Sequence, residues 1–270
     1  SNAYQRAQNN LGIFSQKTLS VGDLFIGAII PGLLICIGYL IYTIIVNRKK
    51  RFIVEASNHN TNLIGTLIPP FLLIFMVLGS IIAGVATPTE AAGIGALGSV
   101  LIACFSKKIS IKLLKEISFQ SAKITTMIFA ILIGASIFSL VFRGIGGDEL
   151  IDQLFGILPG GPLAALIIVL LGIFIIGFIL DFIEICYVIV PLVAPPLLMM
   201  GFDPVWLAIL IAIILQTSFL TPPFGFSLFY LRGVVDESVK TIEIYRGVVP
   251  FIVIQLLVLI VVIAFPMIIF

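Results

Sequence analysis

The chain has 270 residues, of which 60% are hydrophobic and only 10% are charged, with a formal net charge of +2. Soluble domains carry about 25% charged residues, so this composition excludes a soluble protein and predicts an integral membrane protein. The three cysteines lie far apart in apolar segments and the single histidine lies in a polar loop, so neither a disulfide framework nor a zinc site is expected.

Eight apolar segments approach the length of about 20 residues that an α-helix needs to cross a bilayer. Ahead of them, Ser1–Ala3 resemble the remnant of a cleaved expression tag, and residues 4–20 are expected to form an external loop. The natural chain is therefore expected to begin upstream of this sequence. The segments are Val21–Val46, Leu63–Val85, Thr89–Phe105, Ile124–Phe142, Pro162–Leu180, Ile185–Met200, Val205–Tyr230 and Val248–Phe270.

Lysine and arginine residues predict the orientation, because cytoplasmic loops carry an excess of them. They gather in three groups, at residues 48–51, 107–123 and 232–246. Placing these groups in the cytoplasm leaves only Arg6, Lys17 and Arg143 outside.

Three apolar segments, Pro162–Leu180, Ile185–Met200 and Val205–Tyr230, must fit between an external loop at 144–161 and the cytoplasmic Arg246. The first two can form a re-entrant hairpin that enters and leaves on the outside, or all three can cross. The link Asp181–Glu184 carries two acids and no basic residue, which favours a hairpin tip at membrane depth.

Two amphipathic pieces lie between the apolar segments. Residues 109–118 place lysines opposite apolar side chains, which suits a helix on the inner leaflet, and residues 148–158 are interpreted as the external counterpart. A plain connecting helix is the alternative for both. Trp206 lies near the expected external edge and is interpreted as an aromatic interface anchor.

Three acids in or beside the apolar segments have no basic partner in this chain: Glu90, Asp181 and Glu184. A charge at mid-membrane costs on the order of 2.5–3.5 kcal/mol, so such acids need a cation, a proton or hydrogen-bond donors from the fold. The alternative is that they cap helix N-termini, where the helix dipole favours negative charge. Residues Thr87–Glu90 have the pattern of such a cap, whereas Asp181 and Glu184 fit either interpretation.

The segment Val205–Tyr230 is interrupted by Thr221-Pro222-Pro223. The two prolines remove two N–H donors and free carbonyl groups about one turn earlier. Such carbonyls and nearby side-chain oxygens are ligands for a hard cation such as Na⁺, and a helix restarting after Gly225 offers its positive end to an anionic substrate. A plain proline kink with Ser and Thr repairing the backbone remains the alternative. The side-chain candidates are Gln216, Thr217, Ser218 and Thr221.

Taken together, five motifs resemble the large membrane subunit of TRAP (tripartite ATP-independent periplasmic) transporters over most of residues 19–250. The most specific is Thr87-Pro88-Thr89-Glu90-Ala91-Ala92, and Phe224 stands where the family more often has valine. The motifs are Leu19–Phe25 with Pro31-Gly32, Thr87–Ala92, Leu180-Asp181 with Pro191 and Pro195-Pro196, Gly201–Trp206, and Leu220–Gly225.

The resemblance implies an all-α integral membrane protein that contains one inverted repeat of an ion-transporter-type elevator fold, with a re-entrant hairpin and a discontinuous helix. It implies scaffold-type helices over 21–143 and half of a transport domain over 144–232, with the hairpin at 163–200 and the broken helix at 205–230. An amphipathic connector and a last transmembrane helix follow over 233–270. The first repeat, with half of the ligands, is absent from this chain, so these residues alone are not expected to transport.

By position, the resemblance assigns a Na⁺ site to the hairpin tip and the helix break, with the substrate alongside. The acidic pair Asp181 and Glu184 departs from the family, in which the second position is usually apolar or small. The Na⁺ candidates are Asp181, Ile183, Glu184, Ser218, Thr221 and Gly225, and the residues expected to border the substrate are Thr217, Ser218, Pro222, Pro223 and Gly225.

The resemblance implies a non-enzymatic function: Na⁺-coupled import of organic acids across the bacterial inner membrane. The expected partners are a small membrane subunit, a periplasmic solute-binding protein, the substrate and the lipid bilayer. Na⁺ would be the coupling ion, and neither a cofactor nor nucleic acid is expected. Two alternatives stay open: a stand-alone Na⁺- or H⁺-driven carboxylate carrier, and a membrane assembly subunit without a transport role.

Overall fold

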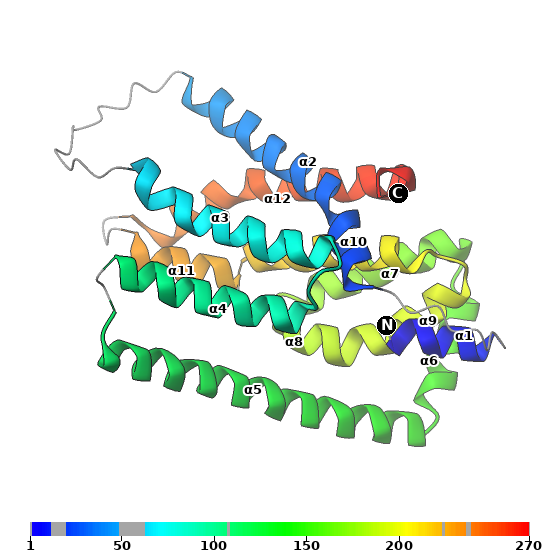
Figure 1. Ribbon diagram of the computed structural model, residues 1–270. Coiled ribbons are helices and arrows are strands. Elements are labelled where there is room, and N and C mark those ends of the chain that lie inside the picture. The colour runs from blue at the N-terminus through cyan, green and yellow to red at the C-terminus, as the bar shows by residue number, and fades with distance from the viewer. Residues whose placement is uncertain are drawn as a thin grey trace. The chain divides into compact units, whose positions relative to one another are not determined.

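The computed structural model describes residues 2–11, 20–48, 63–106, 109–222, 225–235 and 239–269, and in these ranges every regular element is a helix (Figure 1). Five helical runs are long and apolar enough to cross a membrane. Shorter apolar stretches are Leu67–Ile82 within α3 (Leu63–Ile82), α7 (Gly161–Ile176) and α10 (Pro204–Leu220). The chain is therefore an all-α, multi-pass membrane protein. The five runs are α2 (Val21–Asn47), α4 (Pro88–Phe105), α5 (Ile111–Gly144), Phe182–Met199 and α12 (Thr241–Ala264).

The residues form two compact units. The first comprises Ser1–Leu19, Gly27–Ile44 and Ile128–Phe270, and the second comprises Ser20–Ile26 and Ile45–Met127. All candidate ion and substrate residues between Asp181 and Gly225 belong to the first unit.

In the second unit, α3 and α4 pack against each other. Gly98 of α4 permits the approach, because a Cβ atom at this position would lie 2.4 Å from the Leu73 Cδ1 of α3. Large side chains such as Phe75, Leu97 and Phe105 remain exposed. Exposed apolar side chains of this kind are expected where a helix faces lipid.

Helix α5 has 34 residues, which corresponds to about 51 Å at 1.5 Å per residue. The sequence predicts a separate amphipathic helix over residues 109–118, but this piece is continuous with the apolar span that follows. The Ser110 Oγ accepts a hydrogen bond from the Leu113 N–H at the start, and neither glycine nor proline interrupts the helix before Gly134. With no residue to break it, the helix continues.

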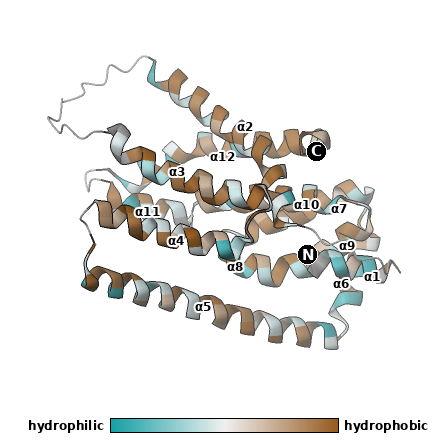
Figure 2. Ribbon diagram, in the orientation of Figure 1, coloured by the Kyte–Doolittle hydropathy of each residue, from teal (hydrophilic) through white to brown (hydrophobic). Residues whose placement is uncertain are grey.

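In the first unit, α10 packs against α7 and α12. Helices α10 and α12 are themselves mainly apolar on every side (Figure 2), as is typical of buried or membrane-spanning helices. Trp206 of α10 is 5% exposed, and its Nε1 donates a hydrogen bond to the Val262 carbonyl of α12 at 3.0 Å. The residue four positions after Val262 is Pro266, which has no N–H, so the indole takes the place of the missing donor. The interpretation of Trp206 as an aromatic interface anchor is therefore wrong, because its ring is buried inside the protein.

Residues 4–20 do not form a loop throughout, because Asn2–Asn10 form the helix α1, which packs on α9 (Val190–Met199). Alanine, glutamine and arginine favour a helix here, and Ala7 is only 2% exposed. The polarity of this stretch indicates a loop, whereas helix propensity and packing produce a helix.

The predicted hairpin consists of α7, a short turn, and a second helical run. This run begins with α8 (Phe182–Glu184), widens into the π-helical turn η1 (Ile185–Ile189) and continues as α9. The π turn adjoins Pro191, whose missing N–H disturbs the α-helical ladder. Helix α9 packs on α7 and on α6 (Gly147–Ile157).

The predicted break in the next segment is present. Helix α10 ends at Leu220 and α11 (Phe226–Val234) begins after Gly225. Helix α12 starts at Thr241, seven residues before the predicted span, and ends at Ala264, where Phe265 and the short helix η2 (Pro266–Ile268) follow. The amphipathic connector expected after residue 233 is thus partly the first turn of α12.

Candidate functional site at two helix breaks

The hairpin tip and the break between α10 and α11 lie against each other. Gly177, at the end of α7, contacts Ser218 so closely that a Cβ atom added to the glycine would lie 2.5 Å from the Ser218 Oγ. On the other side of the tip, the rings of Phe182 and Phe219 meet edge to face with centroids 5.4 Å apart. Two segments that are remote in sequence therefore form one junction within the first unit.

Asp181 forms the N-cap of the second helical run of the hairpin. Its Oδ1 accepts a hydrogen bond from the Phe182 N–H at 2.7 Å, and its carbonyl accepts one from the Ile185 N–H at 3.1 Å. Asp181, Ile183 and Glu184 are each partly buried. The capping role expected as one alternative for Asp181 is present in the structure, and a cap carboxylate keeps further lone pairs for a second partner.

The hydroxyl groups at the end of α10 all donate to carbonyls of their own helix. Thr217 bonds the Ile213 carbonyl at 2.8 Å, Ser218 the Leu215 carbonyl at 2.7 Å, and Thr221 the Thr217 carbonyl at 2.9 Å. Thr217 and Ser218 are 0% and 4% exposed. Since each hydroxyl has a single proton, these oxygens offer only lone pairs to anything else at the junction.

Gly225 allows the chain to fold back after the break. A Cβ atom at this position would lie 2.7 Å from the Phe219 carbonyl oxygen and 3.1 Å from that of Thr221. Only glycine fits at such a distance, and its absence of a side chain lets backbone oxygens crowd together. Pro222 lies beside this turn, and Pro223 is outside the described residues.

Four helix ends meet at the junction: the C-terminal ends of α7 and α10 and the N-terminal ends of the run beginning at Phe182 and of α11. Each end carries roughly half an elementary charge, negative at a C-terminus and positive at an N-terminus. The two pairs nearly cancel, so the helix ends alone leave little net charge at the junction.

Comparison with known proteins identifies the chain. Residues 10–268 match the family described as the tripartite ATP-independent periplasmic transporter, DctM component. The chain belongs to this family. It therefore resembles transport permeases over nearly its whole length.

Three curated relatives illustrate the match. The chain is 26% identical over 255 residues to the sialic acid TRAP transporter large permease protein SiaM of Vibrio cholerae, covering 92% of this chain and 58% of that protein. It is 28% identical over 287 residues to the C4-dicarboxylate TRAP transporter large permease protein DctM of the same organism, covering 94% and 61%. It is 27% identical over 247 residues to the isethionate TRAP transporter permease protein DctMQ of Oleidesulfovibrio alaskensis, covering 90% and 39%. The chain spans about half the length of the curated relatives it matches.

The segment Thr87–Ala92 has a structural role in the second unit. The Thr87 Oγ1 accepts from the Glu90 N–H at 3.4 Å, and the Glu90 Oε2 accepts from the Thr87 N–H and hydroxyl, both at 2.8 Å. This reciprocal capping box starts α4, with Pro88 at its first position. Of the two interpretations of Glu90, the helix cap is the one observed.

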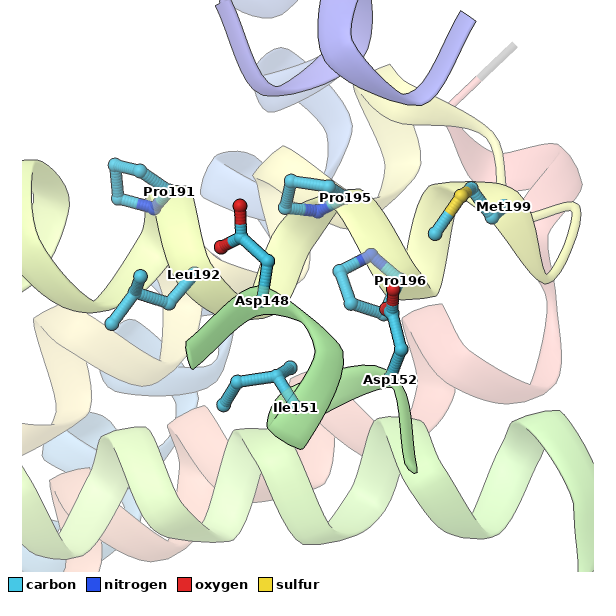
Figure 3. A pocket seen from close by; sticks show the side chains of 8 residues that line it. All are labelled: Asp148, Ile151, Asp152, Pro191, Leu192, Pro195, Pro196 and Met199. Atoms are coloured by element: carbon cyan, nitrogen blue, oxygen red, sulfur yellow. The ribbon is translucent and has the colours of Figure 1, made fainter. Parts of the chain in front are cut away.

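A polar cleft lies elsewhere in the first unit, between α6 and α9. Asp148 and Asp152 of α6 face the prolines of α9 across it (Figure 3). Burial, together with the neighbouring acids of α6, raises the pKa of Asp152. This cleft holds none of the sequence-predicted site residues.

Sequence reasoning missed the part that Gly177, Phe182 and Phe219 play in the junction. Gly177 follows an uninterrupted apolar run and carries no local signal, because the need for a small residue comes from Ser218 in another helix. The phenylalanines belong to segments already recognised as breaks, but only their contact shows that the breaks meet.

Proposed function

We propose that this chain is the C-terminal part of the large membrane subunit of a Na⁺-coupled TRAP transporter that imports an organic acid. The observation that carries the proposal is the set of oxygens at the junction of the hairpin and the broken helix. Their hydroxyl protons are already donated within α10. Oxygens left with only lone pairs suit a cation.

A Na⁺ ion is proposed to bind at this junction. Hydroxyl oxygens of Ser218 and Thr221, carboxylate oxygens of Asp181 and Glu184, and backbone oxygens near Ile183 and the Gly225 turn would supply the hard ligands. Hard cations take six or more such oxygens. The proposed set would reach this number without a histidine or cysteine.

The substrate would lie next to the ion. The N-terminal end of α11, after Gly225, provides N–H groups and a positive partial charge toward an anion. Thr217, Ser218, Pro222 and Pro223 would line the space between this end and the ion. A bound Na⁺ would also attract the acid, so that ion and substrate stabilise each other's binding, which is the basis of coupled transport.

The relatives supply the class of substrate and the partners. The three relatives described above are named as transporters of sialic acid, C4-dicarboxylates and isethionate. Each of these transported compounds is an organic acid. We infer that this chain works in the inner membrane with a small membrane subunit and a periplasmic solute-binding protein. We also infer that the hairpin and the broken helix move together as part of an elevator-type transport domain, since they are packed against each other at the junction.

Uptake by the complete transporter in proteoliposomes, with its binding protein present, tests the proposal. We expect uptake with a Na⁺ gradient and none when K⁺ replaces Na⁺. Ser218→Ala and Thr221→Val should raise the Na⁺ concentration that gives half-maximal uptake by about tenfold, which corresponds to roughly 1.4 kcal/mol for one lost ligand.

Matched controls separate ion binding from helix repair. Ser136 and Thr126 donate to carbonyls of their own helix at 2.8 Å, as Ser218 and Thr221 do, but they belong to α5, which carries no candidate site residue. Ser136→Ala and Thr126→Val should leave the Na⁺ dependence unchanged. Uptake of equal rate in K⁺, or equal effects of the site and control variants, would refute the proposed ion site.

A further inference from the structure

An apolar groove of about 370 Å³ lies between α3 and α4 in the second unit. Leu73 and Gly98 are half-buried and belong to its floor, whereas Leu97, Leu101 and Phe105 are exposed along its sides. Among the described residues, none with a charged or polar side chain lines the groove. Because a polar group without a partner is costly in such surroundings, the part of a ligand that fits here must be apolar.

Two close contacts hold α3 and α4 antiparallel along the groove. A Cβ atom on Gly98 would lie 2.4 Å from the Leu73 Cδ1, and one on Gly95 would lie 3.3 Å from the Val77 Cγ2. Since residue numbers rise along α3 as they fall along α4, the start of α3 and the end of α4 lie at the same end of the pair. The pattern of basic residues predicts that this end faces the cytoplasm.

The length of the groove matches one leaflet of a bilayer. On α4 it extends from Ile94 to Phe105, which are eleven residues apart, or about 16 Å at 1.5 Å per residue. The hydrocarbon core is about 30 Å thick, so the groove reaches from the cytoplasmic surface to about the middle of the membrane. A transmembrane helix of a partner would need a contact surface across both leaflets, whereas a single acyl chain needs only this length.

The sequence at the cytoplasmic end of the groove favours an anionic headgroup. Between Phe105 and Glu116 the chain has four lysines and no acid. Two of these, Lys112 and Lys115, are exposed in the first turns of α5 and belong to the same unit as the groove. Basic residues beside a membrane span attract anionic lipids.

Two backbone carbonyls at the same end lack their usual donors. Pro69 and Pro70 lie inside α3 and have no N–H, so the carbonyls of Gly65 and Thr66 cannot receive a hydrogen bond from four residues later. Backbone carbonyls are strong acceptors that need a partner. A headgroup with hydroxyl groups can supply the missing donors, whereas a choline headgroup cannot.

We propose that one phosphatidylglycerol molecule of the inner leaflet binds at this groove. One acyl chain lies between α3 and α4, and the phosphate lies toward Lys112 and Lys115. The glycerol hydroxyls donate to the carbonyls of Gly65 and Thr66. Phosphatidylethanolamine also carries donors, but its ammonium group would lie among the lysines, so it binds more weakly.

A photoreactive phosphatidylglycerol with a diazirine midway along one acyl chain tests the position of the lipid. With the complete transporter in nanodiscs, peptide mapping should find crosslinks within residues 69–76 and 94–105. The same probe with an ethanolamine headgroup should give several-fold fewer crosslinks there. Crosslinks confined to other segments would show that something else, such as a helix of a partner subunit, covers the groove, and would overturn the proposal.

Substitutions separate the acyl chain from the headgroup. Leu101→Trp places a larger side chain at the groove and should lower these crosslinks at least fivefold, whereas Val100→Trp, at an exposed position of α4 outside the groove, should leave them unchanged. Lys112→Gln and Lys115→Gln should each weaken phosphatidylglycerol binding about fivefold, and Lys123→Gln, further along α5, should not. Equal crosslinking in the two tryptophan variants, or an unchanged preference for phosphatidylglycerol when both lysines are replaced, would contradict the site.

Discussion

A single methyl group at Gly177 should disturb the junction between the hairpin and the broken helix. In Gly177→Ala the new Cβ would lie 2.5 Å from the Ser218 Oγ, 2.6 Å from the Ser218 Cβ and 3.1 Å from the Ile173 carbonyl oxygen. Ser218 cannot easily move away, because it is 4% exposed and its hydroxyl bonds the Leu215 carbonyl. The backbone at Gly177 is ordinary, with φ −64°, so the clash alone determines the effect.

The expected size follows from two opposing terms. Overpacking a buried contact costs about 1–3 kcal/mol, and replacing glycine by alanine in a helix returns at most about 1 kcal/mol. The net loss for Gly177→Ala is therefore about 1–2 kcal/mol. At roughly 2–4 °C for each kcal/mol in a protein of this size, the melting temperature should fall by several degrees.

Gly172→Ala is the matched control, since this glycine lies in the same helix and a Cβ there would meet nothing within 4 Å. It should leave the melting temperature unchanged or raise it slightly. The double variant Gly177→Ala with Ser218→Gly should recover much of the loss, because it removes the side chain that clashes. Equal melting temperatures for Gly177→Ala and Gly172→Ala in purified protein would refute the close contact.

Three further outcomes are expected in thermal unfolding. Thr87→Ala should lower the free energy of unfolding by about 0.5–2 kcal/mol, because α4 loses its N-cap. The Na⁺ dependence of uptake should stay the same, and a changed dependence would contradict a purely structural role for Thr87 and Glu90. Trp206→Phe should lower the free energy of unfolding by about 1–3 kcal/mol, because it leaves the Val262 carbonyl unpaired. An unchanged melting temperature would argue against that hydrogen bond. Burial and like charges raise the pKa of Asp152, so the folded state is destabilised as pH rises from the ordinary carboxyl range through the raised pKa. Asp152→Asn should therefore be more stable than the parent at neutral pH and equal to it at acid pH, whereas a difference independent of pH would exclude this cause.

The helical spans could be predicted from the sequence because a backbone in hydrocarbon must satisfy its own hydrogen bonds. The prolines at 222–223 mark the end of α10, but a proline pair alone does not decide a helix end, because Pro195 and Pro196 lie inside α9. The start of α1 and the continuity of α5 could not be predicted in the same way. Polar residues 4–10 have no apolar pattern of their own, and the amphipathic residues 109–118 differ from the following span in hydropathy but not in helix propensity.

Parts of the candidate site could also be predicted from the sequence. Thr221 and Gly225 are recognisable because proline and glycine break an apolar run, and Asp181 because an acid follows one. Hydrogen-bond directions were beyond such reasoning, since a hydroxyl near a proline can donate to the backbone or to a ligand. Trp206 was misjudged for a similar reason: its partner, Val262, lies in a different helix, and its free carbonyl results from Pro266.

The π-helical turn Ile185–Ile189 bears on how the hairpin tolerates changes in chain length. A π turn contains one residue more than an α-helix would use along the same path. Deleting one residue there would convert the turn to regular α-helix and leave α9 facing α6 and α7 as before. The same deletion inside α9 would rotate every later side chain by about 100°, turning its packed face away from its neighbours. Insertions and deletions among relatives should accordingly be tolerated at this turn and rejected a few residues later.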